Sequence, residues 1–129
     1  MDKRILIIED ETLIQDMYRI VLTQKGYIVV VASDGEEALE KVVSNDTFDL
    51  ILLDIMLPKT NGLEVLKSLK APESKAKDTP VWILTNLDQK DVMDEAKQLG
   101  AVKCLVKSRY LPSEIVTEIT DFFTQQETS

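Results

Sequence analysis

The chain has 129 residues, of which 44% are hydrophobic and 29% charged, with 23 acidic residues against 15 basic ones and a net charge of -8. This length is close to the commonest domain size, which predicts one domain over residues 1–129 with an ordered core from about 3 to 124. The acidic balance disfavours direct binding to nucleic acid, because a negative surface repels phosphate backbones. No apolar run approaches the length of a membrane span, so no membrane contact is expected.

Histidine and cysteine usage narrows the chemistry that this chain can perform. The sequence has no histidine, which removes most histidine-based catalysis and the commonest transition-metal ligand. Any phosphohistidine in its chemistry must therefore be carried by another molecule. Cys104 is the only cysteine, which excludes an intrachain disulfide and favours a reducing, cytoplasmic compartment.

Short apolar runs alternate with longer amphipathic stretches along the chain. Unbroken apolar runs are typical of strands buried on both faces of a parallel sheet, and apolar residues at helical spacing indicate helices. In chain order we expect strand 5–8, helix 12–25, strand 28–31, helix 35–44, strand 50–53, helix 62–70, strand 81–84, helix 89–99, strand 102–106 and a helix from about 111. A polar loop is expected at 71–78 and a short, frayed polar tail at 124–129.

Five strand–helix units in strict alternation predict an α/β fold with a parallel sheet and right-handed crossovers. Five units favour a flavodoxin-like (βα)5 three-layer sandwich with strand order 2-1-3-4-5. In such sheets, ligands bind beyond the carboxyl ends of the strands, where the strand order reverses. The residues that end each strand are therefore the candidates for function.

Polar side chains stand at four of these strand ends. Glu9 and Asp10 follow the first strand, Asp54 the third, Thr85 the fourth and Lys107 the fifth. Crowded carboxylates repel one another, and a hard divalent cation such as Mg²⁺ relieves the conflict. Together, a carboxylate nucleophile, a metal, a lysine and a hydroxyl make a phosphoryl-transfer site.

Each of these residues also has a simpler interpretation when it is taken alone. An acidic residue at a strand end is usually a turn former or a helix N-cap, as Asp10 or Glu11 could be. Thr85 could cap the next helix, and a lone Lys107 is usually a solvated charge. The prediction depends on all of them meeting at one edge of one sheet.

Four segments carry a further signal: Arg4–Glu11, Asp54–Pro58 with the pair Asn61-Gly62 shortly after it, Pro80–Thr85 and Gly100–Lys107. Together these segments closely resemble receiver domains of the response-regulator family.

The resemblance implies a phosphoacceptor role for Asp54 in a signalling domain that is not an enzyme but assists its own phosphorylation and dephosphorylation. It implies that Asp10 binds Mg²⁺ directly, with Mn²⁺ able to substitute, that Glu9 binds it through water, and that Met56 offers its backbone carbonyl. Thr85 and Lys107 would contact the phosphoryl group.

The resemblance also implies two classes of protein partner. The donor would be a phosphohistidine on a histidine kinase or a histidine phosphotransfer protein. A downstream protein would bind the surface of the fourth helix, fifth strand and fifth helix, which includes Lys103, Arg109 and Tyr110.

Several positions depart from the family's pattern. Cys104 stands where an aromatic residue is usual, and Asn86 stands where a small residue is usual next to Thr85. Ser108 follows Lys107 in place of proline, and we expect a trans bond there, because a cis bond without proline costs about 3–4 kcal/mol.

Several other functions remain open at this point. A pseudo-receiver would bind partners without phosphorylation, and a receiver module could belong to a longer regulator with an output domain. A flavodoxin-type carrier of flavin mononucleotide is disfavoured, because the first loop is acidic rather than a phosphate cradle. A haloacid-dehalogenase-type phosphatase is disfavoured because Met56 stands where its motif needs a second Asp.

Overall fold

The computed structural model describes residues 2–45 and 47–128. Every predicted strand and helix is present, and the ends differ by at most one residue, apart from the end of the last helix. The elements are β1 (Arg4–Ile8), α1 (Thr12–Gln24), β2 (Ile28–Ala32), α2 (Gly35–Ser44), β3 (Leu50–Leu53), α3 (Gly62–Leu69), β4 (Val81–Thr85), α4 (Lys90–Gln98), β5 (Lys103–Val106), the short 3-10 helix η1 (Lys107–Arg109) and α5 (Pro112–Thr128).

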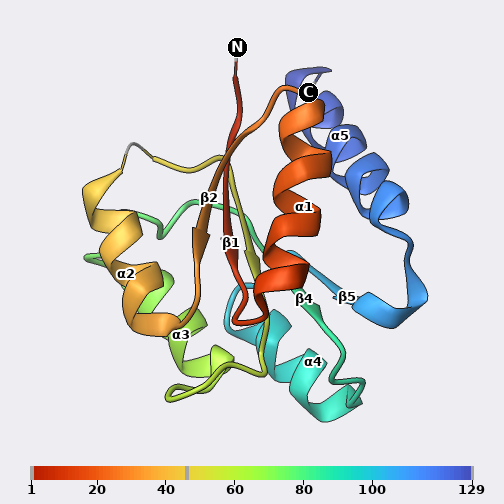
Figure 1. Cartoon of the computed structure of the whole chain (residues 1–129). Helices are drawn as coiled ribbons and strands as arrows, with labels where there is room; N and C mark the ends of the chain where they lie inside the picture. The colour runs from red at the N-terminus through yellow and green to blue at the C-terminus, as the bar shows by residue number, and fades with distance from the viewer. Residues whose placement is uncertain (1, 46, 129) are drawn as a thin grey trace.

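The five strands form one parallel sheet in the order β2-β1-β3-β4-β5, which confirms the predicted flavodoxin-like topology. β1 lies between β2 and β3, with Ile8 opposite Ala32 on one side and Leu53 on the other. The strand order therefore reverses at β1, with β2 on one side of it and β3, β4 and β5 on the other. The loops after β1 and β3 leave the sheet side by side (Figure 1).

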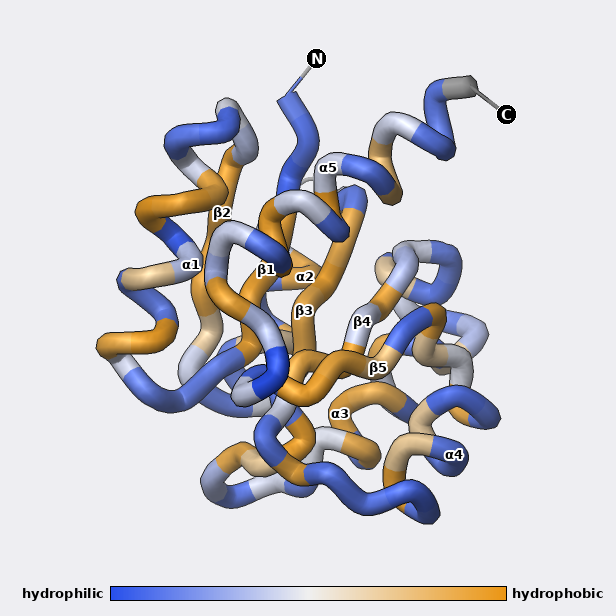
Figure 2. Tube along the Cα trace, turned by 90° about the vertical axis from the view of Figure 1, so that its right-hand side faces the viewer, coloured by the Kyte–Doolittle hydropathy of each residue, from blue (hydrophilic) through white to orange (hydrophobic). Residues whose placement is uncertain are grey.

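Helices cover both faces of the sheet. In Figure 1, α1 and α5 lie together on one face, while α2, α3 and α4 lie on the other. Alternate residues of each strand enter the two resulting cores: Ile5 and Ile7 pack towards α1 and α5, whereas Leu6 and Ile8 pack towards the other three helices. Figure 2 shows the strands as an apolar centre between more polar helices.

Glycine and proline end or begin the helices where the sequence predicted. Gly26 follows α1 with φ +93° and Gly100 follows α4 with φ +111°, a backbone region that glycine adopts without steric cost. Pro112 is the first residue of α5, where its missing N–H is not needed. Within residues 2–45 and 47–128, no helix is long and apolar enough to cross a bilayer.

The prediction of a frayed tail from residue 124 is wrong as far as residue 128. α5 continues to Thr128, and the Thr124 hydroxyl donates to the Thr120 carbonyl at 2.9 Å. Polarity was a poor guide to the helix end, because glutamine and glutamate favour helices and no glycine or proline stops this one. Buried Phe123 holds the preceding turn against the sheet. Ser129 lies outside the described residues.

Candidate functional site

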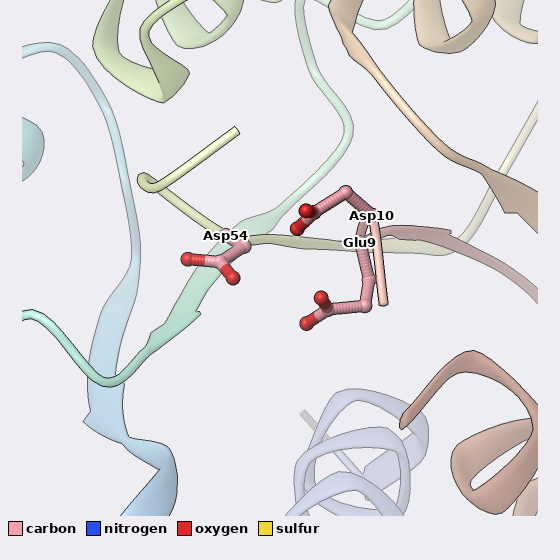
Figure 3. A group of neighbouring side chains, drawn as sticks. All are labelled: Glu9, Asp10 and Asp54. Carbon is pink, nitrogen blue, oxygen red and sulfur yellow. The ribbon is translucent and has the colours of Figure 1, made fainter. Parts of the chain in front are cut away.

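The ends of β1 and β3 bring three carboxylates together. Ile8 and Leu53 are paired across the two strands, and the Asp54 N–H donates to the Ile8 carbonyl at 3.1 Å. One carboxylate oxygen from each of Glu9, Asp10 and Asp54 lies within 4.8 Å of the others. Figure 3 shows the three side chains gathered at the end of these adjacent strands. The site thus has the oxygen-rich character that Mg²⁺ prefers.

The three carboxylates differ in their exposure to solvent. Glu9 is 2% exposed and Asp54 is 6% exposed, whereas Asp10 is exposed. Asp10 is therefore the carboxylate of the cluster that solvent reaches most readily, and Glu9 lies on its inner side.

Lys107 lies against this cluster from the end of β5. Its Nζ donates to Asp54 Oδ2 at 2.9 Å and also bonds Glu9 Oε1. The Lys107 side chain is 9% exposed, so both ion pairs are shielded from solvent. The sequence predicted that Lys107 faces Asp54, but it did not predict the bond to Glu9.

Burial and charge together raise the pKa values of both Glu9 and Lys107. Burial raises the pKa of the Glu9 carboxyl, although the Lys107 ammonium and the Glu11 N–H both lower it. Burial lowers the pKa of Lys107, but its bonds to Glu9 and Asp54 outweigh burial and the net pKa is raised. Lys107 is therefore a fixed cation at neutral pH, and it neutralises carboxylates that have little access to water.

Thr85 ends β4 beside β5, where it is paired with Val106. It is fully buried, and its Oγ1 accepts a hydrogen bond from the Leu87 N–H at 3.2 Å. This bond closes a local turn after the strand. The simpler interpretation of Thr85 as a helix cap is wrong, because the N-cap of α4 is Gln89.

Gln15 is a supporting residue that sequence reasoning missed. It is buried, and its Nε2 donates to the Glu9 carbonyl and to Ser33 Oγ, the latter at 3.1 Å. The link holds the backbone of the acidic loop against the end of β2. A signal was present, since Gln15 shares the buried face of α1 with Tyr18 and Leu22, and a polar residue on such a face needs a partner.

The simpler interpretation of the acidic loop as a helix cap holds for the position of Glu11 but not for its side chain. Glu11 is the N-cap residue of α1, but its side chain makes no capping hydrogen bond. Its N–H instead donates to Glu9 Oε2 at 3.0 Å, which helps to orient that carboxylate. The loop is organised around Glu9 rather than around the helix end.

Three hydrogen bonds donated by backbone N–H groups hold the loop after Asp54. The Met56 N–H donates to Asp54 Oδ1 at 3.0 Å, and the Gly62 N–H donates to the Ile55 carbonyl at 2.9 Å. Asn61 caps α3 by accepting from the Leu63 N–H at 2.7 Å. These bonds fix the acceptor carboxylate at the root of a short, closed loop.

A surface pocket of about 630 Å³ opens beside the cluster. Asp10 lines it together with Met56, which is 57% exposed, and Leu87. The two apolar side chains stand on opposite loops, one after β3 and one after β4. They offer no hydrogen bond to water at the mouth of the site.

The departures from the family pattern have local consequences. The peptide bond before Ser108 is trans, as predicted. The Ser108 N–H, which a proline would lack, donates to Asn86 Oδ1 at 3.0 Å, so the two residues that depart from the family pattern contact each other. Cys104 points its thiol towards the Met93 carbonyl, with 3.9 Å between Sγ and the oxygen.

Comparisons with known proteins agree with this fold and site. The sequence profile described as response regulator receiver domain matches residues 5–120. The alkaline phosphatase synthesis transcriptional regulatory protein PhoP of Bacillus subtilis is 38% identical over 115 residues, which cover 89% of this chain and 46% of that protein.

Two solved structures extend the comparison. A CheY-like response regulator receiver domain protein from Methanospirillum hungatei has a TM-score of 0.87 at 28% identity, covering 99% of this chain and 98% of that one. The Mn²⁺-bound form of response regulator Rcp1 has a TM-score of 0.80 at 30% identity, covering 94% of each chain.

The chain belongs to the response regulator receiver domain family, the phosphoryl-accepting domains of two-component signalling systems. Receiver domains interact with histidine kinases or phosphotransfer proteins. The chain spans about half the length of the curated relatives it matches, 46% of PhoP from Bacillus subtilis and 51% of PhoB from Escherichia coli.

Proposed function

We propose that Asp54 accepts a phosphoryl group from a phosphohistidine on a histidine kinase or phosphotransfer protein. A carboxylate oxygen of Asp54 attacks the phosphorus, an O–P bond forms, the N–P bond breaks, and the released imidazole nitrogen takes a proton from water. The observation that carries this proposal is the Lys107 ammonium 2.9 Å from Asp54 Oδ2, beside two further carboxylates. The same ammonium can offset charge on the phosphoryl oxygens, and we assign the Thr85 hydroxyl to one of those oxygens.

A divalent cation fits this site. Asp10 and Asp54 would hold Mg²⁺ directly, Glu9 would support it through water, and the Met56 carbonyl would complete the protein's share. When bound, the cation supplies positive charge that stabilises the phosphoryl oxygens during transfer. The Mn²⁺-bound form of Rcp1 supports this proposal and the substitution of Mn²⁺ for Mg²⁺.

The output of the domain is a change in a protein-binding surface. We place this surface on α4, β5 and α5, where Lys103 pairs with Glu118 at 3.3 Å and Arg109 pairs with Asp88. All four side chains are partly exposed, and Arg109 stands in η1, two residues after Lys107. The pseudo-receiver alternative from the sequence is tested by the experiment below.

Intact mass after incubation with acetyl phosphate tests the proposal. We expect one phosphoryl adduct on the wild type in Mg²⁺, and none when EDTA removes the metal. Asp54→Asn should show none in either condition, because an amide oxygen is too weak a nucleophile to replace the carboxylate. A wild type that takes up no phosphoryl group in Mg²⁺ would support the pseudo-receiver instead.

The phosphorylated form is expected to hydrolyse slowly. Met56 and Leu87 line the opening, and neither can orient an attacking water by hydrogen bonding. Met56→Asn should therefore accelerate loss of the phosphoryl group by roughly threefold to tenfold, the effect of about one hydrogen bond. Val43→Asn is the matched control, since Val43 is 76% exposed on α2, away from the opening. Equal lifetimes for Met56→Asn and the wild type would contradict this prediction.

A further inference from the structure

Two loops leave the sheet side by side at the phosphoryl-transfer site. One follows Thr85 at the end of β4, and the other begins with Lys107 in η1, directly after Val106. Thr85 and Val106 are paired across the two strands. The hydroxyl and the ammonium that the proposed function assigns to the phosphoryl group therefore stand at the roots of neighbouring loops.

Two side-chain contacts join these loops. Asn86 Oδ1 accepts the Ser108 N–H at 3.0 Å, and Asp88 pairs with Arg109. We call this pair of contacts the strap. Both contacts are exposed. The ion pair joins two long side chains and contributes little by itself, whereas the hydrogen bond is directional and its donor is a backbone N–H, so it carries most of the constraint. A proline at position 108 would have no N–H to give.

The strap affects the two groups that are assigned to the phosphoryl oxygens, the Thr85 hydroxyl and the Lys107 ammonium. Thr85 is fully buried and its Oγ1 accepts from the Leu87 N–H, so the position of its hydroxyl depends on the loop that follows it. Lys107 is bonded to Glu9 and Asp54, so its position depends on the loop that it begins. Both groups act on one small phosphoryl group, so transfer is fastest in arrangements where both are in place.

We propose that the Asn86–Ser108 bond makes the loop after Thr85 and the loop after Lys107 move as one unit, so that Asn86 is a positioning residue for phosphoryl transfer. This inference rests on the proposed function, because it concerns the same site. The strap reduces the number of loop arrangements in which only one of the two groups is in place. Its loss lowers the rate of transfer by leaving more of these arrangements accessible.

A double-mutant cycle on the rate of phosphorylation tests whether the Asn86–Ser108 bond couples the two loops. The rate constant for phosphorylation by acetyl phosphate, which releases acetate, is measured by intact mass at saturating Mg²⁺. Asn86→Ala removes the acceptor, Ser108→Pro removes the donor N–H, and Ser108→Ala is the control that keeps it. Each of the first two should lower the rate constant about threefold to tenfold, and Ser108→Ala should leave it unchanged.

The combination of the two changes separates positioning from other roles. If the bond is what matters, the double variant Asn86→Ala/Ser108→Pro is no slower than the slower single variant. If the reductions in rate constant multiply in the double variant, Asn86 acts on the phosphoryl group independently of Ser108, and the proposed coupling of the loops is refuted. Asn86 is exposed, so Asn86→Ala leaves the fold intact even if Ser108→Pro does not, and an unchanged rate in Asn86→Ala also overturns the strap. In both cases the adduct still forms and the proposed function stands, whereas a wild type without any adduct refutes the proposed function itself.

Discussion

Replacing Lys107 with methionine is expected to lower the free energy of unfolding by about 3 kcal/mol at neutral pH in the absence of divalent cations. The ammonium bonds both Glu9 and Asp54, and all three side chains are less than one tenth exposed. Methionine keeps most of the length of the side chain but leaves two shielded carboxylates without their cation. Mg²⁺ should bind the variant more tightly than the wild type, because no ammonium competes for the same oxygens. Urea unfolding with EDTA and with Mg²⁺ measures both effects.

The size of this loss should depend on pH in a defined direction. Burial already raises the pKa of Glu9 above its ordinary 4.5, and removing Lys107 takes away an interaction that lowers it. A carboxyl whose folded pKa is raised binds more protons in the folded state, so stability falls as pH rises through that folded pKa. The deficit of Lys107→Met should therefore be small below pH 4.5 and reach its full size at neutral pH.

Lys90→Met is the matched control for this prediction. Lys90 pairs with Asp94 at 2.7 Å, but its side chain is 86% exposed. Exposed pairs contribute little to stability, so this variant should unfold like the wild type. A Lys107→Met protein as stable as the Lys90→Met protein in EDTA would mean that Lys107 does not neutralise the cluster.

Replacing Gly62 with alanine is expected to destabilise the protein by about 3 kcal/mol and to slow phosphorylation of Asp54. A Cβ at Gly62 would lie 2.5 Å from Ile55 Cα and 2.6 Å from the Asp54 carbonyl oxygen. Both neighbours are backbone, so the loop that carries the acceptor must shift to relieve the clash. In an unhindered helix the same change would stabilise the fold. Urea unfolding and the rate of labelling by acetyl phosphate measure the two expected losses.

Gly35→Ala provides a control with the same local position. Gly35 and Gly62 are each the first residue of a helix, after the N-cap residues Asp34 and Asn61. A Cβ at Gly35 would lie 2.6 Å from Val65 Cγ2, which belongs to a side chain rather than to the loop that carries the acceptor. Gly35→Ala should therefore label at the rate of the wild type, even if it loses some stability. Equal labelling by the Gly62→Ala and Gly35→Ala proteins would contradict the account of the Asp54 loop.

The sequence alone predicted the fold and the meeting of the three carboxylates with Lys107 for one physical reason. The carboxyl ends of parallel strands meet at one edge, so the residue that follows each apolar run can be placed without any knowledge of side-chain contacts. Asp54 and Lys107 are 53 residues apart, yet both were assigned to this edge from the strand order, and their side chains are in contact.

The contacts that the sequence did not predict all depend on side-chain direction. Lys107 reaches Glu9 as well as Asp54, and Asn86 accepts from the backbone of Ser108. Neither contact follows from the spacing of apolar residues, because each one crosses between loops whose course is set by tertiary packing. Gln15 could have been suspected from its place on the buried face of α1, but its partners could not have been named.

The most direct test of the central claim is to locate the phosphoryl group in the chain. The wild type is labelled with acetyl phosphate in Mg²⁺, the acyl phosphate is reduced with borohydride, which converts a phosphorylated aspartate to homoserine, and the digested peptides are sequenced by mass spectrometry. We predict homoserine at position 54 and unchanged aspartate at position 10. Homoserine at any other aspartate, with Asp54 unmodified, would contradict the assignment of Asp54 as the phosphoacceptor.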